Sequence, residues 1–323
     1  MTRMVAFRRA ILLTLEVVFS GVLLAQPKIV AVVNSASWQS GLPGPGALAT
    51  AFVSGLTGLT PGTYAAPSSH ALPHSLAGLY VELNGDYAPL LAVIVPTDPA
   101  DNVQINFQVP LSAMTSLCPF SNSVPGACDP NGYLVIGGAG QNPLAWQSPL
   151  EAFEPFGAFF AQAKRIAVAV HASDFSPVTL QNPAHPGEAI VAYADDFFMT
   201  WPPPPIATPV PPQPVFQVNY QWVRQLGNLF LQTYPTPVIP CISARTPCIG
   251  SITNTPALKI DSMSLAPGSV GVEQIKFEVP SNQKPGAWAL FFNVGSCPDG
   301  SGIPGTCGGQ GGVSSPYVLL PVD

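Results

Sequence analysis

Charged side chains are scarce in this sequence. Asp, Glu, Lys and Arg make up 9% of its 323 residues, against about 25% in an average soluble protein. Residues 1–25 hold Arg3, Arg8, Arg9 and Glu16, which leaves 8 basic and 16 acidic side chains to the rest of the chain. So acidic a chain is a poor partner for nucleic acid or an anionic membrane surface, and we expect neither.

Helical patterns are also missing. Beyond residue 25 no segment sustains an apolar period of 3.6 between helix caps. Proline, at 39 of 323 residues, is more than twice as frequent as its usual share of about 5% and fits turns and strand ends better than helices. Because hydrophobic residues reach 47%, the chain can still build a core. We therefore predict an all-β protein.

Short β-branched and aromatic runs separated by Gly, Pro and Asn support this fold class. Val103–Val109 alternates apolar and polar residues, which is typical of a half-buried strand. Many short strands with turns between them indicate β-sandwiches. The predicted strands include Ile29–Val33, Leu48–Ser54, Leu79–Leu83, Leu90–Val95, Gln104–Val109, Ile166–His171, Ala189–Ala194, Val272–Val279, Trp288–Val294 and Tyr317–Pro321.

No nucleophile elbow is present. The chain has no G-x-S-x-G, the local pattern of a common class of serine hydrolases. His171 ends a predicted strand and Asp174 follows it, but a Ser–His–Asp triad depends on geometry that sequence does not supply. We predict that the protein is not an enzyme and that it has no catalytic residue and no cofactor.

Metal ligands are equally poorly indicated. His70 and His74 have the helical spacing of a zinc pair, but Pro73 between them makes a helix there improbable. His185 precedes Pro186, which favours a structural role in a turn. The acidic groups match no EF-hand or RTX repeat and are interpreted as turn residues, although calcium binding by an acidic loop stays open. These groups are Asp98, Asp101 and Asn102, and Asp195 with Asp196.

The N-terminus predicts export. A basic start precedes an apolar stretch from Ile11 to Leu24, which is broken only by Glu16 and ends at Ala25. This is the pattern of a secretory signal peptide, and the stretch is shorter than the roughly 20 residues of a membrane span. We expect residues 1–25 to be removed and no membrane span to remain. An uncleaved N-terminal anchor is the alternative.

The six cysteines agree with an oxidising compartment. They form three sequence-local pairs flanked by Pro and Gly: Cys118 with Cys128, Cys241 with Cys248, and Cys297 with Cys307. Their spacing is not that of common zinc sites. We predict three local disulfides in a secreted or cell-surface bacterial protein.

Two pairs of segments show an internal duplication. Gln104–Pro110 (QINFQVP) matches Gln274–Pro280 (QIKFEVP), 170 residues later, and Gly46–Ser54 resembles Gly187–Asp195. Two copies are too few for a solenoid or propeller, so we predict two tandem domains. Their expected bounds are 26–154 and 155–323.

Aromatic residues beside a proline tract are candidate ligand contacts. Phe197, Phe198 and Trp201 precede residues 202–214, which hold eight prolines in thirteen positions and should be extended. Aromatic side chains on a loop could contact a sugar or a protein. About half of them could equally face the core of the preceding strand.

Several segments carry a family resemblance. They are Val32–Trp38, the Pro45-Gly46 lead into a strand, Leu83–Leu91, Gln104–Pro110, Asn182–Glu188 and Gly271–Ile275. Through them the chain resembles the uncharacterised C-terminal domain of Solibacter-type acidobacterial secreted proteins. The resemblance implies two immunoglobulin-like domains and no known catalytic or binding residue. The sequence departs from the family after Tyr193, where a glycine-rich turn is expected, and the domain pair is expected to be the whole exported product.

The function predicted from these features is non-catalytic. We expect an exported module for adhesion, spacing or protein contact, with an extracellular protein or polysaccharide as its partner. A carbohydrate-binding module and a secreted hydrolase with an unrecognised site are the alternatives. An exposed aromatic row on a sheet face would favour sugar binding, and converging His, Asp and Ser side chains would favour the hydrolase.

Overall fold

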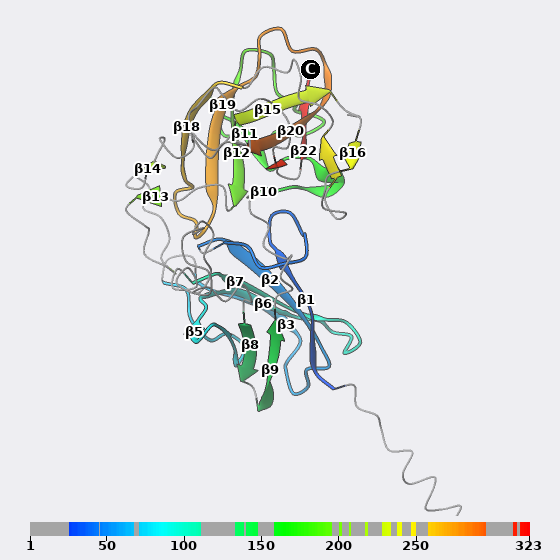
Figure 1. Ribbon diagram of the computed structural model, residues 1–323, viewed down its shortest axis with the longest axis vertical. Helices are drawn as coiled ribbons and strands as arrows, with labels where there is room; N and C mark the ends of the chain where they lie inside the picture. The colour runs from blue at the N-terminus through cyan, green and yellow to red at the C-terminus, as the bar shows by residue number, and fades with distance from the viewer. Residues whose placement is uncertain are drawn as a thin grey trace, which may run out of the picture.

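The computed structural model is built from antiparallel β-sheets (Figure 1). It describes residues 26–44, 46–67, 71–110, 133–138, 140–147, 158–195, 258–294 and 317–323, the short segments 200–201, 217–218, 228–233, 238–240, 247–249 and 313–314, and residue 207. In this part of the chain the helical content is the single 3-10 turn η2 (Ala163–Arg165). No described helix has the length and apolar character of a membrane-spanning helix.

The first half of the chain forms two sheets around one core. One sheet has the order β1-β2-β7-β6-β3 and the other β5-β4-β8-β9. Alternate residues of the strands, such as Val103, Ile105 and Phe107 of β7, point into the core between them. The strands are β1 (Lys28–Asn34), β2 (Leu48–Ser54), β3 (Gly62–Ala65), β4 (Leu79–Leu83), β5 (Asp86–Tyr87), β6 (Leu90–Val95), β7 (Val103–Gln108), β8 (Tyr133–Gly138) and β9 (Gln141–Gln147).

The second half has its own core, which lies between two sheets. One sheet has the order β10-β12-β19-β18-β14-β13, and β11 also pairs with β12. In the other sheet β20 pairs with β15, β21 and β22. A separate hairpin joins β16 and β17. The strands are β10 (Ala158–Phe159), β11 (Ala169–His171), β12 (Ala189–Asp195), β13 (Thr200–Trp201), β14 (Gln217–Val218), β15 (Asn228–Thr233), β16 (Val238–Pro240), β17 (Pro247–Ile249), β18 (Ile260–Leu265), β19 (Glu273–Glu278), β20 (Gly286–Val294), β21 (Val313–Ser314) and β22 (Val318–Val322).

The duplicated segments form strand pairs with the same register. Leu48 lies opposite Gln108 in β2 and β7, and the matching Ala189 lies opposite Glu278 in β12 and β19. The next strands, β6 and β18, pair with β7 and β19 with the same 170-residue offset, and both carry a bulge at the same position, Leu91 and Asp261. Since a one-residue slip would turn every side chain to the other face, the two halves share one sheet architecture.

One predicted strand is shorter than expected. Ile166–His171 was expected to be extended throughout, but β11 begins only at Ala169. Lys164 and Arg165 just before it have φ values of 60° and 61°, which turn the chain. Ile166 is left with an isolated bridge to Leu319 of β22. The other predicted strands lie within two residues of observed ones.

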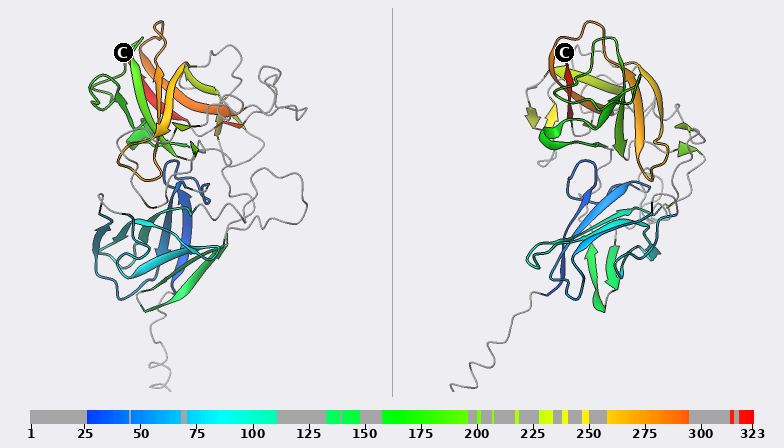
Figure 2. Two further views of the ribbon diagram at one scale, coloured as in Figure 1. Left: turned by 90° about the vertical axis from the view of Figure 1, so that its left-hand side faces the viewer. Right: turned by 180° about the vertical axis from the view of Figure 1, so that it is seen from behind.

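The two halves are stacked end to end (Figure 2). They touch through backbone and buried polar groups. The Leu48 amide donates to Oδ2 of the wholly buried Asp195 at 2.8 Å. Gly271, with φ of 69°, lies so close to the first half that a Cβ there would be 2.8 Å from the Gly46 carbonyl oxygen. The signal peptide (1–25) and the boundary at 154–155 lie outside the described residues, so both stay predictions.

Candidate functional site

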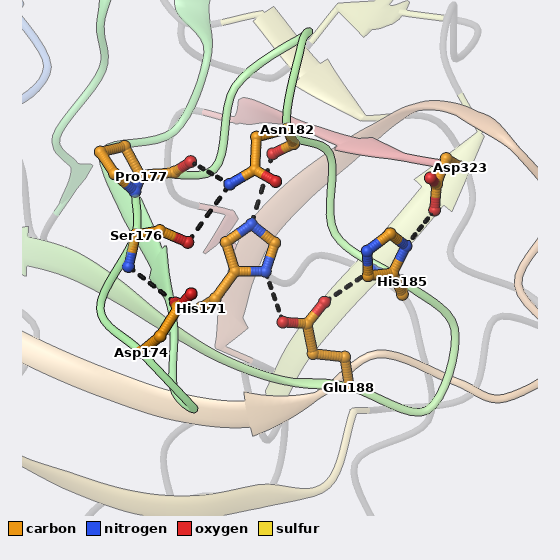
Figure 3. Close-up of polar contacts among 8 residues, drawn as sticks. All are labelled: His171, Asp174, Ser176, Pro177, Asn182, His185, Glu188 and Asp323. Carbon is orange, nitrogen blue, oxygen red and sulfur yellow. Dashed lines mark hydrogen bonds and ion pairs between the residues drawn. The ribbon is translucent and has the colours of Figure 1, made fainter.

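Two neighbouring His–carboxylate pairs form a cluster of titratable side chains in the second half (Figure 3). His171 ends β11, Glu188 directly precedes β12, and His185 lies in the turn before Glu188. His171 Nδ1 contacts Glu188 Oε1, and His185 Nδ1 contacts Asp323 Oδ1. The two imidazole rings are 6.2 Å apart. The cluster therefore joins β11, the turn before β12 and the residue after β22.

The two pairs differ in their exposure to solvent. The His171 side chain is 6% exposed and Glu188 17%, whereas His185 and Asp323 are 58% and 51% exposed. Glu188 Oε2 also accepts a 2.8 Å hydrogen bond from the His185 backbone amide. The inner pair thus fixes the turn that carries the outer pair, and exposed ion pairs such as the outer one contribute little to stability.

The candidate triad residues make other contacts. Asp174 Oδ1 accepts from the Ser176 amide at 2.9 Å, and this hydrogen bond is the main reason that the pKa of the carboxyl is lowered. Ser176 Oγ accepts from Asn182 Nδ2 at 3.3 Å. The second His171 nitrogen, Nε2, lies 3.4 Å from the Asn182 carbonyl oxygen. His171, Asp174 and a serine are neighbours, but they do not form a Ser–His–Asp relay.

The turn after His171 repeats the turn after Asn34. The register of β1 on β2 and of β11 on β12 places Asn34 and His171 at equivalent positions. Trp38 donates its amide to the Asn34 carbonyl and Phe175 donates to the His171 carbonyl, each at 2.9 Å. Trp38 and Phe175 also share a left-handed φ, 61° and 59°. The two turns are therefore the same structure with different side chains.

The side-chain contacts of the two turns differ at one point. Asn34 Oδ1 accepts from the Ala36 and Ser37 amides at 2.7 and 3.0 Å and so closes its turn alone. His171 reaches instead to Glu188, and the residue equivalent to Glu188 in the first half is Ala47. The His171–Glu188 pair therefore occupies a place where the first half needs only one amide side chain, and its geometry is that of a structural contact.

Acidic residues predicted as turns behave in two ways. Asp98 Oδ1 accepts from the Ala100 amide at 2.8 Å, a side-chain turn typical of Asp. Asp195 ends β12 and is buried against Leu48 of the first half, so interpreting it as a turn residue was wrong. Asp196 and His70 lie outside the described residues. Within the described chain no group of three His, Cys, Asp or Glu side chains could hold a metal ion.

The remaining predicted site residues are mostly outside the described chain. Phe197 and Phe198 are not described, and of Trp201 only the backbone in β13 is. Of the six cysteines only the backbone of Cys248, opposite Ile239 in the β16–β17 hairpin, is described. The disulfides involving Cys118, Cys128, Cys241, Cys297 and Cys307 stay predictions.

A group of tyrosines was missed at the sequence level. Tyr80, Glu82, Tyr87 and Tyr133, hereafter the tyrosine face, lie on the outer side of the β5-β4-β8-β9 sheet, because Leu79, Val81, Leu83 and Leu134 point into the core. Tyr87 and Tyr133 are 52% and 50% exposed. The alternation of Leu79–Leu83 places Tyr80 and Glu82 on one face, a signal that was available in the sequence.

Comparison with known proteins identifies no family. Neither a protein-family model nor a curated protein matches the chain. Among solved structures, it is 10% identical to red sea bream transglutaminase (TM-score 0.20; 92% of this chain, 32% of that one) and 10% to the dimeric latent PorU of Porphyromonas gingivalis (0.22; 92% and 24%). It is 12% identical to a putative membrane-anchored protein of Corynebacterium diphtheriae (0.16; 90% and 57%). The chain thus spans between a quarter and somewhat over half of these structures.

Proposed function

We propose that this chain is an exported, non-catalytic β-sandwich module that serves adhesion, spacing or protein contact at the cell surface or outside the cell. The observation that carries the proposal is the equivalence of His171 and Asn34. The second half has a buried histidine whose ring nitrogens contact Glu188 and a backbone carbonyl. The equivalent position in the first half is a turn-closing amide side chain.

The contact between the halves supports a spacing role. Asp195 is wholly buried where it accepts the Leu48 amide, and Gln108 Oε1 accepts the amide of Ala207 at 3.0 Å. Buried hydrogen bonds to a carboxylate are among the stronger ones. A chain whose two halves are held in this way transmits a fixed spacing better than two domains on a free linker.

The sequence composition supports export. Few charges, a predicted signal peptide at 1–25 and three predicted disulfides together favour an extracellular setting. We propose immunoglobulin-like domains with bounds 26–154 and 155–323, because each half has its own core between two antiparallel sheets.

A double variant tests the proposal. His171→Asn with Glu188→Ala gives the second half the side chains that the first half has at the two equivalent positions, Asn34 and Ala47, so a structural cluster should tolerate it. We expect no turnover of ester, peptide or glycan substrates by the wild type. We also expect an unchanged fraction of wild-type and double-variant protein recovered with washed cells. Trp38→Ala changes the equivalent turn of the first half, and it is the matched control for the effect of altering an exposed turn on recovery with cells.

The hydrolase alternative predicts the opposite result. Turnover that is present in the wild type and lost in the double variant, while far-ultraviolet circular dichroism shows an intact fold, would contradict the proposal.

A further inference from the structure

The tyrosine face has the geometry of an aromatic binding platform. Tyr87 of β5 lies directly opposite Glu82 of β4, and Tyr80 of β4 lies opposite Gly137 of β8. The Tyr80 and Tyr87 rings meet edge to face with centroids 5.3 Å apart. Tyr133 of β8 lies on the same face, four residues along its strand from Gly137. The three tyrosines therefore stand on three neighbouring strands, with Tyr80 and Tyr87 in contact and Tyr133 further along the face.

Gly137 fixes the position of Tyr80 on this face. A Cβ at residue 137 would lie 2.4 Å from the Tyr80 hydroxyl oxygen and 2.5 Å from Cζ. The ring therefore lies directly over the glycine, in space that any other residue would fill. A ring held on the sheet in this way is ordered before a ligand arrives, which lowers the entropic cost of binding.

Exposure of this face is particular to the first half. In the second half the corresponding sheet places Leu290 and Phe292 in the core and Ala289 and Phe291 on its other side. Ala289 and Phe291 are nevertheless 0% exposed, and Tyr317, with the Arg165 guanidinium 5.2 Å from its ring centroid, packs against them. The second half covers the side of the sheet that the first half leaves open.

Charge restricts the ligand. Glu82 and Asp86 are the charged residues on β4 and β5, and Lys28 is the single Lys or Arg between residues 26 and 154. An anionic polymer would meet only carboxylates here, whereas the hydroxyl groups of a neutral sugar can donate to Glu82 and bond to the tyrosine hydroxyls. Aromatic rings with a few polar groups are typical of sites that bind amphipathic ligands.

We propose that the tyrosine face binds a neutral polysaccharide chain, with Tyr87 and Tyr133 as the exposed contact rings and Tyr80 as the fixed ring between their strands. This inference rests on the proposed function, because it names the partner of a non-catalytic module.

Affinity gel electrophoresis of the mature protein tests the inference. The probes are hydroxyethylcellulose, xyloglucan, galactomannan and laminarin as neutral polymers and polygalacturonate as an anionic one. We expect retardation by at least one neutral polymer and none by polygalacturonate. Tyr87→Ala and Tyr133→Ala should each weaken the apparent affinity by about tenfold, the effect of losing one aromatic contact. Tyr87→Phe, which keeps the ring, should retain most of it.

The controls use exposed aromatic residues elsewhere. Trp38→Ala and Phe175→Ala remove rings that are 56% and 69% exposed and should leave the retardation unchanged. Retardation that survives both tyrosine substitutions, or retardation by polygalacturonate equal to that by the neutral polymers, would overturn the site. A wild type that no neutral polymer retards would overturn the ligand class, and the face would then fit a protein partner instead. Failure of the non-catalytic proposal can be distinguished from failure of the binding site. An enzyme would release reducing ends from the same polymers, whereas a binding module would not.

Discussion

His171 holds in the second half of the chain the position that Asn34 holds in the first. The side-chain oxygen of Asn34 accepts a backbone hydrogen bond within its own turn. His171 contacts instead the side chain of Glu188, which directly precedes the next strand. The same backbone turn is thus stabilised by two different chemical solutions, and the difference between them can be measured.

Removing His171 alone should be costly. His171→Ala removes the histidine partner of the mostly buried Glu188 carboxylate, which keeps the hydrogen bond from the His185 amide. We expect the free energy of unfolding to fall by about 1–3 kcal/mol. The double variant His171→Asn with Glu188→Ala also removes this carboxylate and should be less destabilised than His171→Ala. Urea unfolding measures both, and a double variant that is the weaker of the two would contradict a structural pair.

Asp195 should protect the contact between the halves. Asp195→Ala leaves the Leu48 amide without its acceptor, and we expect a loss of about 1–3 kcal/mol and faster hydrogen exchange at Leu48. Asp195→Asn keeps a side-chain oxygen and should have the smaller effect. Exchange measured by NMR at Leu48 decides this, with Thr50 in the same strand as internal reference. Equal protection in wild type and Asp195→Ala would show that the hydrogen bond is not retained in solution.

Gly137 should tolerate no side chain while Tyr80 is present. Gly137→Ala places a methyl group where the Tyr80 ring lies, and overpacking of this kind costs about 1–3 kcal/mol. Combining it with Tyr80→Ala frees the space, so the double variant should recover part of the loss. Thermal unfolding of the four proteins gives the coupling, and strictly additive effects would show that the ring does not rest on the glycine.

The pKa of Asp174 gives a pH dependence of known sign. The Ser176 amide lowers the pKa of this carboxyl below its ordinary value of 3.8. A group whose pKa is lowered by folding stabilises the folded state above the unfolded pKa, so its contribution is lost as the pH falls below 3.8 through the folded value. A carboxyl NMR titration should place the Asp174 midpoint below 3.8. Asp174→Asn should remove this dependence while keeping an acceptor for Ser176.

The cysteines should be oxidised in local pairs. We expect Cys118 with Cys128, Cys241 with Cys248, and Cys297 with Cys307 in protein recovered from outside the cell. Because these bridges close short loops, each should contribute roughly 2–3 kcal/mol, and reduction should lower stability without abolishing the fold. Mass spectrometry of non-reduced peptides identifies the pairs, and a bridge between the two halves would refute the local scheme.

Short β-branched and aromatic runs predicted much of the sheet structure. Leu48–Ser54, Leu79–Leu83 and Leu90–Val95 were predicted with the bounds that the structure has, because such residues favour strands and the Gly, Pro and Asn between them favour turns. The match of Gln104–Pro110 with Gln274–Pro280 identified two strands that do have equivalent partners.

The equivalent turns could not be found in this way. The six residues from Asn34 to Gln39 and from His171 to Ser176 share no identical residue. What they share is a set of backbone hydrogen bonds, which many side chains permit. The buried role of Asp195 was not predicted for another reason. Its partner Leu48 is 147 positions away in the sequence, and a local pattern carries no information on so distant a contact.

The stacking of the halves also determines the symmetry of the molecule. The start of β2, at Leu48, meets the end of β12, at Asp195. His171, in the second half, pairs with the opposite end of β12. The contact between the halves therefore joins unlike ends, which a twofold rotation would not do. Such heterologous contacts do not close on themselves after two units, so the two outer ends of the molecule, marked by Ser54 and His171, are not equivalent.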